Sequence, residues 1–369
     1  MARTPAKPRA ARSAPAAAEP AIIDCAVHPQ VVRPDDLKAY MREPWNARAF
    51  PRPERYFYPA IGGEYIEGTA ATGLAGSDPE LLAKRLFDEG GVAIAHLVPQ
   101  TRGLLPDLDL GTVVCRATND WLADCWLGAA NAHGRFRGTI RVNPGDPAGA
   151  VEEIERWSDH PGMVSITVPM QSHQPYGQRA FFPVWEAAAR AGLPVLVKID
   201  GGSGVDFWPT AVGHPHHYVE YKTVAPLAYA YHLISFIAEG VFTRLPDLRV
   251  VFADGGHDLL PPLVWRMDKN WRPTRRETPW VEELPSAYVR RQVRFCTSLL
   301  EGPSDPAVAE GWLELGEGAD LLVYASRYPF HDYQSPAAAS VGLPDASRER
   351  IMGGNAAALF RRDAKRRAA

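Results

Sequence analysis

Short apolar runs alternate with longer amphipathic segments along most of the chain. The apolar runs are five to eight residues long, which is the length of strands buried on both faces of a parallel sheet. The predicted strands cover residues 21–28, 92–97, 136–142, 163–168, 194–199, 248–253, 292–296 and 321–325. Because a helix follows each strand, the pattern predicts an α/β fold of eight βα units, which is a (β/α)8 or TIM barrel.

The segments between the strands have the length and periodicity of helices, except for one long insertion. The predicted helices cover residues 78–89, 111–133, 147–158, 180–191, a stretch ending near 240, 258–271, 305–315 and 345–361. The insertion, residues 30–77, follows the first strand, is rich in Pro, Gly and aromatic residues, and contains a short predicted helix at 34–42. Connections of this length are uncommon in compact domains and are usually either functional or disordered, and a predicted helix inside this one favours a functional segment. We therefore expect the insertion to form a pocket lid or an interface.

The two ends of the chain do not have the composition of folded segments. Residues 1–20 are almost entirely Ala, Pro, Arg and Ser and lack the apolar core of a secretory signal, so we expect a disordered tail. Residues 362–369 form a short basic tail. The barrel domain is therefore predicted to span residues 21–361.

Composition and charge narrow the class of protein. A formal net charge of −3 with 46% hydrophobic residues predicts a large core and gives no reason to expect a nucleic-acid partner or a membrane surface. No apolar run is long enough to span a bilayer. The cysteines form no CxxC pair, and we expect four buried, reduced thiols in a cytoplasmic protein. They are Cys25, Cys115, Cys125 and Cys296.

Polar residues collect where the predicted strands end. In a (β/α)8 barrel the carboxyl ends of all strands open on one mouth, and active sites lie there. The polar residues at these ends are His28, His96, Asn143, Lys198, Asp200, Asp254, His257, Thr297 and Arg327. Burying such groups costs free energy unless they pair with one another or with a ligand. We therefore expect a pocket at the mouth.

Four segments, spread over nearly the whole chain, resemble the amidohydrolase-related branch of the amidohydrolase superfamily. Residues 23–29 are similar to its opening D-C-D-x-H-P strand, and residues 239–256 to its G-V-F-x-R-x-P segment. Residues 320–336 are similar to S-D-Y-P-H-x-D-x-x-S-P, and residues 352–360 to the closing N-A-x-x-L-F. The resemblance implies a (β/α)8 barrel of the kind used by zinc- or manganese-dependent hydrolases and decarboxylases.

The positions at which this family holds its metal carry other residues here. The resemblance places the ligands at Ala26, His28, Lys198, Asp254 and Arg327. His28 is a ligand of the family's type and Asp254 is a suitable donor, but Ala26 has no donor atom. Protonated lysine and arginine side chains offer no lone pair and repel a dication. We therefore expect no metal cofactor.

The first functional hypothesis is a folded barrel that has lost its metal site. Lys198 and Arg327 would occupy the metal cavity and pair with Asp254. The chain would then be a pseudoenzyme in a homo- or hetero-oligomer with an active amidohydrolase or decarboxylase paralogue. Aromatic residues of the insertion would suit such an interface. They are Trp45, Phe50, Tyr56, Phe57 and Tyr58.

The second hypothesis is a metal-independent enzyme that hydrolyses, hydrates or decarboxylates a small carboxylic acid, aromatic acids included. Lys198, desolvated near Arg327, would act as a base or as a Schiff-base amine. Asp254, His28 or His257 would move protons, and Arg327 would bind the carboxylate of the ligand. The residues expected to contact the substrate are His28, His96, Asp200, His217, Thr297 and His331.

A third hypothesis keeps a metal but moves its ligands. The loop after the fifth predicted strand contains His214, His216 and His217, which could join His28 and Asp254 around an ion. The alternative for these histidines is a solvated loop with local hydrogen bonds.

Overall fold

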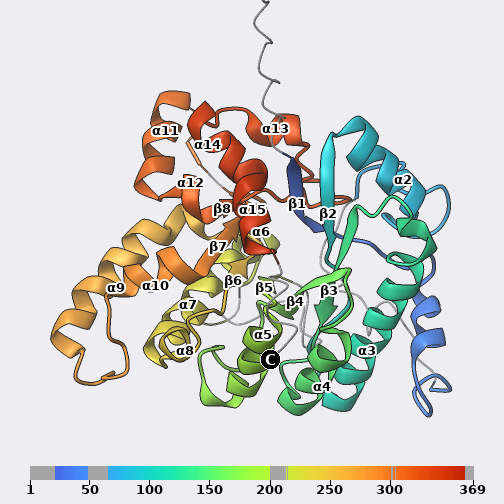
Figure 1. Cartoon of the computed structure of the whole chain (residues 1–369), viewed down its shortest axis with the longest axis horizontal. Helices are drawn as coiled ribbons and strands as arrows, with labels where there is room; N and C mark the ends of the chain where they lie inside the picture. Colours follow the sequence, from blue (N-terminus) through green and yellow to red (C-terminus); the bar gives the residue numbers. More distant parts are fainter. Residues whose placement is uncertain are drawn as a thin grey trace, which may run out of the picture.

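Eight parallel strands stand in chain order, from β1 to β8, with helices around them (Figure 1). The computed structural model describes residues 21–48, 65–199, 213, 215–300, 302–303 and 305–361. The two predicted tails and residues 49–64 of the insertion lie outside the described residues. The strands are β1 (Ile22–Val27), β2 (Val92–Leu97), β3 (Phe136–Arg141), β4 (Met163–Pro169), β5 (Val195–Lys198), β6 (Val250–Phe252), β7 (Val293–Cys296) and β8 (Leu322–Val323).

Backbone hydrogen bonds join the last strand region to the first. The Cys25 N–H donates to the Tyr324 carbonyl at 2.9 Å, and the His28 N–H donates to the Tyr328 carbonyl at 2.8 Å. The sheet therefore curls into a nearly closed barrel. The predicted fold class, a (β/α)8 barrel with an insertion between its first two strands, is confirmed.

Helices pack on the outer face of the barrel, and most begin close to their predicted positions (Figure 1). The main ones are α2 (Pro79–Ala83), α3 (Leu108–Cys125), α4 (Pro147–Trp157), α5 (Phe182–Ala191), α6 (Tyr218–Val224), α7 (Ala228–Ala238), α8 (Val241–Arg244), α9 (Leu260–Thr274), α10 (Pro285–Gln292), α11 (Pro306–Leu315), α12 (Gly318–Leu321), α13 (Pro336–Ser340), α14 (Asp345–Glu349) and α15 (Asn355–Leu359). Short turns of other helix types adjoin several of them, including η1 (Pro34–Tyr40), η2 (Lys84–Glu89), η7 (His257–Leu259) and η8 (Arg350–Gly354).

The bounds of α3 differ most from the prediction, which placed this helix at residues 111–133. The helix begins earlier because the Asp107 side chain accepts the Leu110 N–H at 3.0 Å and so caps the first turn. It also ends earlier, because Gly128 has the non-helical angles φ −83° and ψ −127°. Capping and a glycine turn thus override the apolar pattern at both ends.

The strand β8 is shorter than the predicted strand 321–325. The Tyr324 N–H donates to the Ile351 carbonyl of η8, and the Ala325 N–H donates to the Thr297 hydroxyl at 3.1 Å. Because these groups find partners outside the strand ladder, regular pairing stops at Val323. The chain is thereby released toward the barrel mouth just before Arg327.

One small cluster of apolar side chains from β1, β5, β6, β7 and β8 lies inside the barrel, and the closing segment packs against it. Ala356 at the closing helix α15 packs into this cluster, as do the partly buried Leu359 and Phe360. The Asn355 side chain donates to the Leu322 carbonyl at the start of β8, at 2.8 Å. The closing helix therefore covers the end of the barrel opposite the predicted mouth.

The cysteine prediction is wrong at one position. Cys25, Cys115 and Cys296 are buried and free, but Cys125 is exposed at the end of α3. The apolar pattern placed Cys125 inside a longer helix, whereas the helix actually ends there. No helix within the described ranges is long and apolar enough to cross a membrane.

Candidate functional site at the carboxyl end of the barrel

A buried bridge of one carboxylate and two cations lies at the barrel mouth. The Asp254 carboxylate is 3.3 Å from Lys198 Nζ and 3.0 Å from Arg327 Nη1. It also accepts the Ile199 N–H at 2.7 Å. The side chains of Lys198 and Asp254 are only 3% and 1% exposed, whereas that of Arg327 is 15% exposed. We call Lys198, Asp254 and Arg327 the mouth bridge.

Neighbouring strands bring the first two members of the mouth bridge together. Lys198 is the last residue of β5, and Asp254 follows β6 by two residues. Val197 pairs with Phe252 in register, and the Ala253 N–H donates to the Val197 carbonyl at 2.9 Å. The carboxyl ends of the two strands therefore stop side by side, with an ammonium beside a carboxylate.

Arg327 reaches the mouth bridge through an unusual backbone conformation. Its φ of +60° lies in the left-handed region, which is uncommon for a residue with a side chain. The Arg327 N–H donates to the Ala26 carbonyl at 3.2 Å. The Asp24 side chain accepts the N–H groups of Ala26 and Ser326. The end of β1 thus holds the loop after β8 in place.

Asp24 is fully buried while it makes these contacts. Burial raises its pKa to about 6, and its hydrogen bonds with Ser326 and Ala26 oppose that rise. Asp24 is therefore a positioning group for the Arg327 loop and does not contact the mouth bridge itself.

Burial also perturbs Lys198. It lowers the Lys198 pKa; the Arg327 and Arg141 charges lower it further, and Asp254 opposes them. A buried ion pair is held together mainly because separating it would leave an uncompensated charge in a medium of low dielectric constant. The ion pairs of the mouth bridge are therefore expected to stay formed in the folded protein.

His28 lies beside the mouth bridge as a neutral imidazole. Its Nδ1 is 2.9 Å from the Val98 carbonyl, which can only accept, so Nδ1 carries the proton. Burial holds the His28 pKa well below its usual value, and the Lys198 and Arg327 charges add to that effect. His28 Nε2 is buried and has no hydrogen-bond partner among the described residues.

Arg141 is a site residue that the sequence reasoning missed. It is the last residue of β3, is fully buried, and its charge acts on Lys198. An added Cβ at Gly103 would lie 2.7 Å from the Arg141 guanidinium, so the loop after β2 lies against that group. The sequence does carry a signal for Arg141. Arg137, Thr139 and Arg141 are two residues apart in β3 and therefore lie on one face of the sheet, so a polar face could have been predicted.

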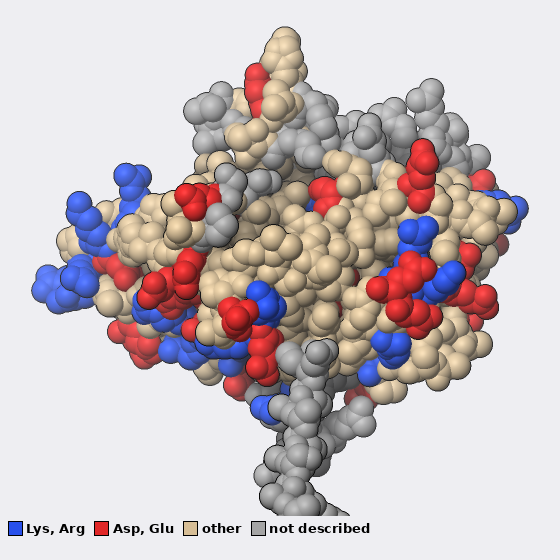
Figure 2. Space-filling view, turned by 90° about the horizontal axis from the view of Figure 1, so that it is seen from above, with Lys and Arg blue, Asp and Glu red and all other residues tan. Residues whose placement is uncertain are grey.

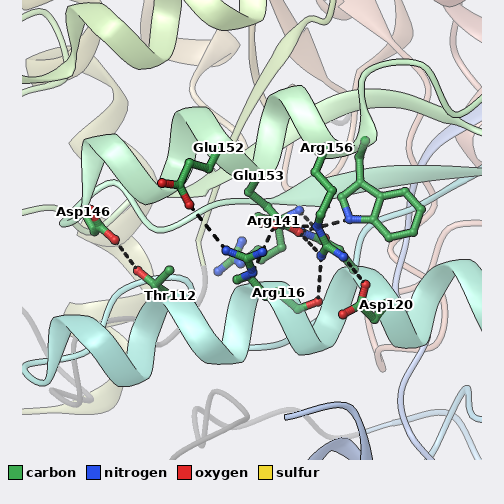
Figure 3. Close-up of polar contacts among 10 residues, drawn as sticks. Thr112, Arg116, Asp120, Arg141, Asp146, Glu152, Glu153 and Arg156 are labelled. Atoms are coloured by element: carbon green, nitrogen blue, oxygen red, sulfur yellow. Dashed lines mark hydrogen bonds and ion pairs between the residues drawn. The ribbon is translucent and has the colours of Figure 1, made fainter. Parts of the chain in front are cut away.

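A network between α3 and α4 fixes the strand that carries Arg141 (Figure 3). The Asn119 side chain accepts the Arg141 N–H at 2.7 Å and donates to the Arg141 carbonyl at 2.8 Å. Its amide also donates to Glu153, which bonds to Arg156 and Trp157. Helix packing outside the barrel therefore sets the position of a cation inside it.

Four other residues predicted at the mouth have contacts within the protein. His96 packs against Phe360 of the closing segment, at 4.1 Å between ring centres. The Thr297 hydroxyl accepts the Ala325 N–H. His257 is buried and its Nε2 donates to the Gly316 carbonyl at 2.9 Å. Asn143 likewise uses its amide locally, donating to the Leu108 carbonyl at 2.9 Å.

The remaining predicted contact residues are not part of the mouth bridge. His217 is exposed before α6, 3.2 Å from a nitrogen of His216. His331 is exposed and has a partner of its own. Asp200 and His214 lie outside the described residues. The structure therefore brings together Lys198, Asp254 and Arg327, with His28 beside them.

The residues at the mouth do not fit a metal ion. Ala26 offers no donor atom, and the Asp254 carboxylate is already bonded to two cations. Lys198 and Arg327 have no lone pair to donate while protonated, and a metal site of the zinc type needs three or four donors. Within the ranges that the structure describes, no group of three or more His, Cys, Asp or Glu residues could hold a metal.

Comparisons with known proteins place this geometry in a family context. At 22% identity, the 5-carboxyvanillate decarboxylase LigW from Sphingomonas paucimobilis has a TM-score of 0.64, covering 93% of this chain and 99% of that chain. An amidohydrolase from Mycobacterium avium subsp. paratuberculosis K-10, at 19% identity, has a TM-score of 0.71, covering 95% of this chain and 100% of that one.

A third similar structure is a dihydroxybenzoic acid decarboxylase from Polaromonas sp. JS666, which has bound manganese and 2-nitroresorcinol. It is 19% identical, with a TM-score of 0.62, covering 92% of this chain and 97% of that chain. No curated protein sequence matches the chain. The family model described as "Amidohydrolase" matches residues 23–362. The chain belongs to the amidohydrolase family.

Proposed function

We propose that this chain does not perform metal-dependent chemistry and serves as a noncatalytic subunit beside an active amidohydrolase or decarboxylase paralogue. One observation carries the proposal: Lys198 and Arg327 stand at two ligand positions and both contact the Asp254 carboxylate. The two cations neutralise the group that a metal would need and occupy its neighbourhood. The intact barrel around them supports retention of the fold for a role other than metal catalysis.

The surface of the molecule supports a role in an assembly. Seen from above, one face carries few charged side chains across its middle, and Lys, Arg, Asp and Glu gather toward its sides (Figure 2). Tyr231 and Ile234 on the outer side of α7 are 58% and 38% exposed. Contiguous exposed apolar surface marks protein–protein contacts, and these two side chains, three residues apart in α7, lie on the same side of the helix.

Metal content tests the first part of the proposal. The purified chain, exchanged into buffer with zinc or manganese and then desalted, should keep less than one equivalent of metal. The matched comparison is a variant with Ala26→His, Lys198→His and Arg327→Asp, which restores the family's ligand types. Its secondary structure should be checked by circular dichroism. A wild-type chain that retains stoichiometric metal would overturn the proposal.

Purification from the native source tests the second part. An amidohydrolase-family chain should copurify in a fixed ratio and should lose activity or stability when this chain is removed. The proposal is wrong if the purified chain alone turns over a substrate and the Arg327→Ala variant does not.

A second candidate is a metal-independent enzyme acting on a small aromatic acid, because Lys198 is buried and its pKa is lowered. A neutral amine can condense with a substrate carbonyl and release water, forming an imine. The similarity to decarboxylases of aromatic acids supports the substrate class. Borohydride should then trap an adduct on Lys198, which mass spectrometry would locate, and Lys198→Arg should form none. The absence of an adduct across aromatic keto and aldehyde acids would count against this candidate.

A further inference from the structure

The helix α7 is apolar on the side that faces away from the barrel as well as on the side that packs against it (Figure 1). Tyr229, Leu233 and Phe236 form its buried inner side, and Tyr231 and Ile234 are exposed on the opposite side. Of the α-helices with eight or more residues in the described ranges, α7 alone contains no Asp, Glu, Lys or Arg. A helix that is apolar all round is normally buried all round. The outer side of α7 therefore has the composition of a contact surface.

The outer residues of α7 form one row. The row consists of Leu227, Tyr231, Ile234 and Ala238. Successive members are four, three and four residues apart along the chain, which is the spacing of the a and d positions of a coiled coil. Side chains at these positions line one side of a helix and pack against the side chains of a second helix. The row therefore fits a helical partner.

A tryptophan extends the row at the carboxyl end of α7. The Trp280 indole donates to the Ala238 carbonyl at 2.7 Å, and a side chain at Gly240 would collide with the Trp280 ring. The indole is therefore fixed against the end of the helix, although Trp280 is 48% exposed. Tryptophan and tyrosine are common among the residues that dominate the binding energy of interfaces. We call the row together with Trp280 the α7 seam.

The spacing of the row reads the same in both directions along the helix. When two copies of α7 pack antiparallel about a two-fold axis, Tyr231 of one protomer lies beside the partner subunit's Ile234. Leu227 lies beside the partner subunit's Ala238, so the larger side chain of each pair meets a smaller one. A two-fold interface uses the same surface on both subunits and makes every contact twice. The row is therefore complementary to itself in size and in spacing.

The charges around α7 suit the same arrangement. The row carries no charge, so two copies can meet without bringing like charges together. Antiparallel helices also place their dipoles in opposite directions. Glu239 is exposed directly after α7, and in this arrangement it lies toward the amino end of the partner's α7, where the helix dipole is positive.

From these observations we propose that the chain forms a two-fold symmetric homodimer in which the α7 seams of two copies pack antiparallel. A bilayer surface fits the seam less well, because helices that lie on membranes carry Lys or Arg beside their apolar side and α7 has neither. Such a homodimer goes beyond the proposed function, because it concerns two copies of this chain and forms with or without a paralogue.

Sedimentation velocity of the purified full-length chain over a range of concentrations tests for the homodimer. The wild type should be dimeric. Tyr231→Glu and Ile234→Lys each place a charge in the seam of both subunits and should weaken self-association on the order of 100-fold or more. The matched control is Val308→Glu on α11, because Val308 is 55% exposed and Tyr231 is 58% exposed. This control should leave self-association unchanged.

Mixing two variants tests the antiparallel register. An equimolar mixture of the Tyr231→Glu chain and the Ile234→Lys chain brings opposite charges together at one contact and keeps the native pair at the symmetric contact. The mixture should therefore form a heterodimer, although neither chain forms a stable homodimer. A mixture of the Tyr231→Glu chain with an Ile234→Glu chain brings like charges together and should remain monomeric.

Circular dichroism and thermal unfolding of each variant, at concentrations where it is monomeric, show whether it is folded. Should Tyr231→Glu fail to fold, Tyr231→Ser and Ile234→Lys are compared with the wild type instead. Both should weaken the dimer, and the charged variant should weaken it more.

Three results would overturn the homodimer proposal. They are a wild-type chain that is monomeric at every concentration, a dimer that folded Tyr231→Glu and Ile234→Lys leave intact, and a mixture of these two chains that stays monomeric. A monomeric chain that binds phosphatidylserine vesicles through the α7 seam would also overturn it. A monomeric chain that binds only an amidohydrolase paralogue through this seam would overturn the homodimer and support the proposed function. Stoichiometric metal in a chain that dimerises through the seam would overturn the proposed function alone.

Discussion

Two ion-pair clusters in this molecule are built from similar groups but lie in different surroundings. The mouth bridge sits inside the barrel, and its lysine and aspartate are almost completely buried. The other cluster lies between α3 and α4 and consists of Glu153, Arg156, Asp120 and Arg116 (Figure 3). We call it the flank cluster. Its Glu153 is 2% exposed, but Arg156 and Asp120 are 32% and 36% exposed.

The two clusters differ in how they respond to the loss of a member. In the flank cluster the arginines reach water, so a freed guanidinium can be solvated. In the mouth bridge Lys198 is enclosed, so the loss of its carboxylate would strand a charge in the protein interior. Burial, and not the number of ion pairs, thus decides which cluster the fold depends on.

The largest expected effect is at the mouth bridge. Asp254→Ala removes the carboxylate that Lys198 and Arg327 share and should destabilise the protein by about 3–5 kcal/mol. Urea unfolding followed by circular dichroism measures this change. A loss below about 1 kcal/mol would mean that the buried bridge behaves like a surface pair.

A smaller effect is expected at the buried member of the flank cluster. Glu153→Ala removes one of the two acceptors of the Asn119 amide and the acceptor of the Trp157 indole, which should cost about 2 kcal/mol. The same unfolding experiment applies. If Glu153→Ala lost as much unfolding free energy as Asp254→Ala, solvation of the freed arginines would not be what limits the loss in the flank cluster.

A pH dependence is expected from Asp24, because burial raises its pKa to about 6. The folded state binds the proton of the Asp24 carboxyl group more tightly than the unfolded chain does. The contribution of that proton to the free energy of unfolding is therefore present at low pH and is lost as pH rises toward 6. Asp24→Asn keeps an acceptor oxygen for Ala26 and Ser326 and should flatten the decline between about pH 4 and 6. The free energy of unfolding is measured for the wild type and for Asp24→Asn across that interval. The same slope with pH in both proteins would contradict the raised pKa of Asp24.

The smallest effect is expected for the exposed carboxylate next to the flank cluster. Glu155→Ala removes a partner of Arg190 at 3.3 Å, and the Glu155 side chain is 63% exposed. The free energy of unfolding should change by less than about 1 kcal/mol. Glu155 and Glu153 lie on the same helix, so comparing their alanine variants isolates the effect of burial. Equal losses of unfolding free energy in the two variants would show that burial does not matter here.

Local pattern was sufficient to predict most of the fold. The strand β2, residues 92–97, was predicted with its exact bounds, because an apolar run between a glycine turn and a proline leaves few alternatives. The bounds of α3 were predicted wrongly, because they depend on the cap at Asp107 and the turn at Gly128. The apolar periodicity contains no information on either. Short-range signals therefore determine which elements exist more firmly than where they end.

The candidate site was predictable only in part. The family resemblance identified Lys198, Asp254 and Arg327 as residues at metal-ligand positions, and the structure brings their side chains into contact. His257 also stands near a strand end in the sequence, yet its ring turns to Gly316 on the outer side of the barrel. A position at a strand end is a local property, but the direction of a side chain depends on the turn that follows.

The sequence by itself determined the eightfold alternation, the family resemblance and the presence of cations where metal ligands would stand. Each follows from residue order along the chain. Only the tertiary structure decided that Lys198 and Arg327 both bond to Asp254, that Arg141 adds a third cation and that Asp24 holds the Arg327 loop. These contacts join residues of different strands, and whether opposite charges neutralise one another depends on distances and burial that arise only when the barrel closes.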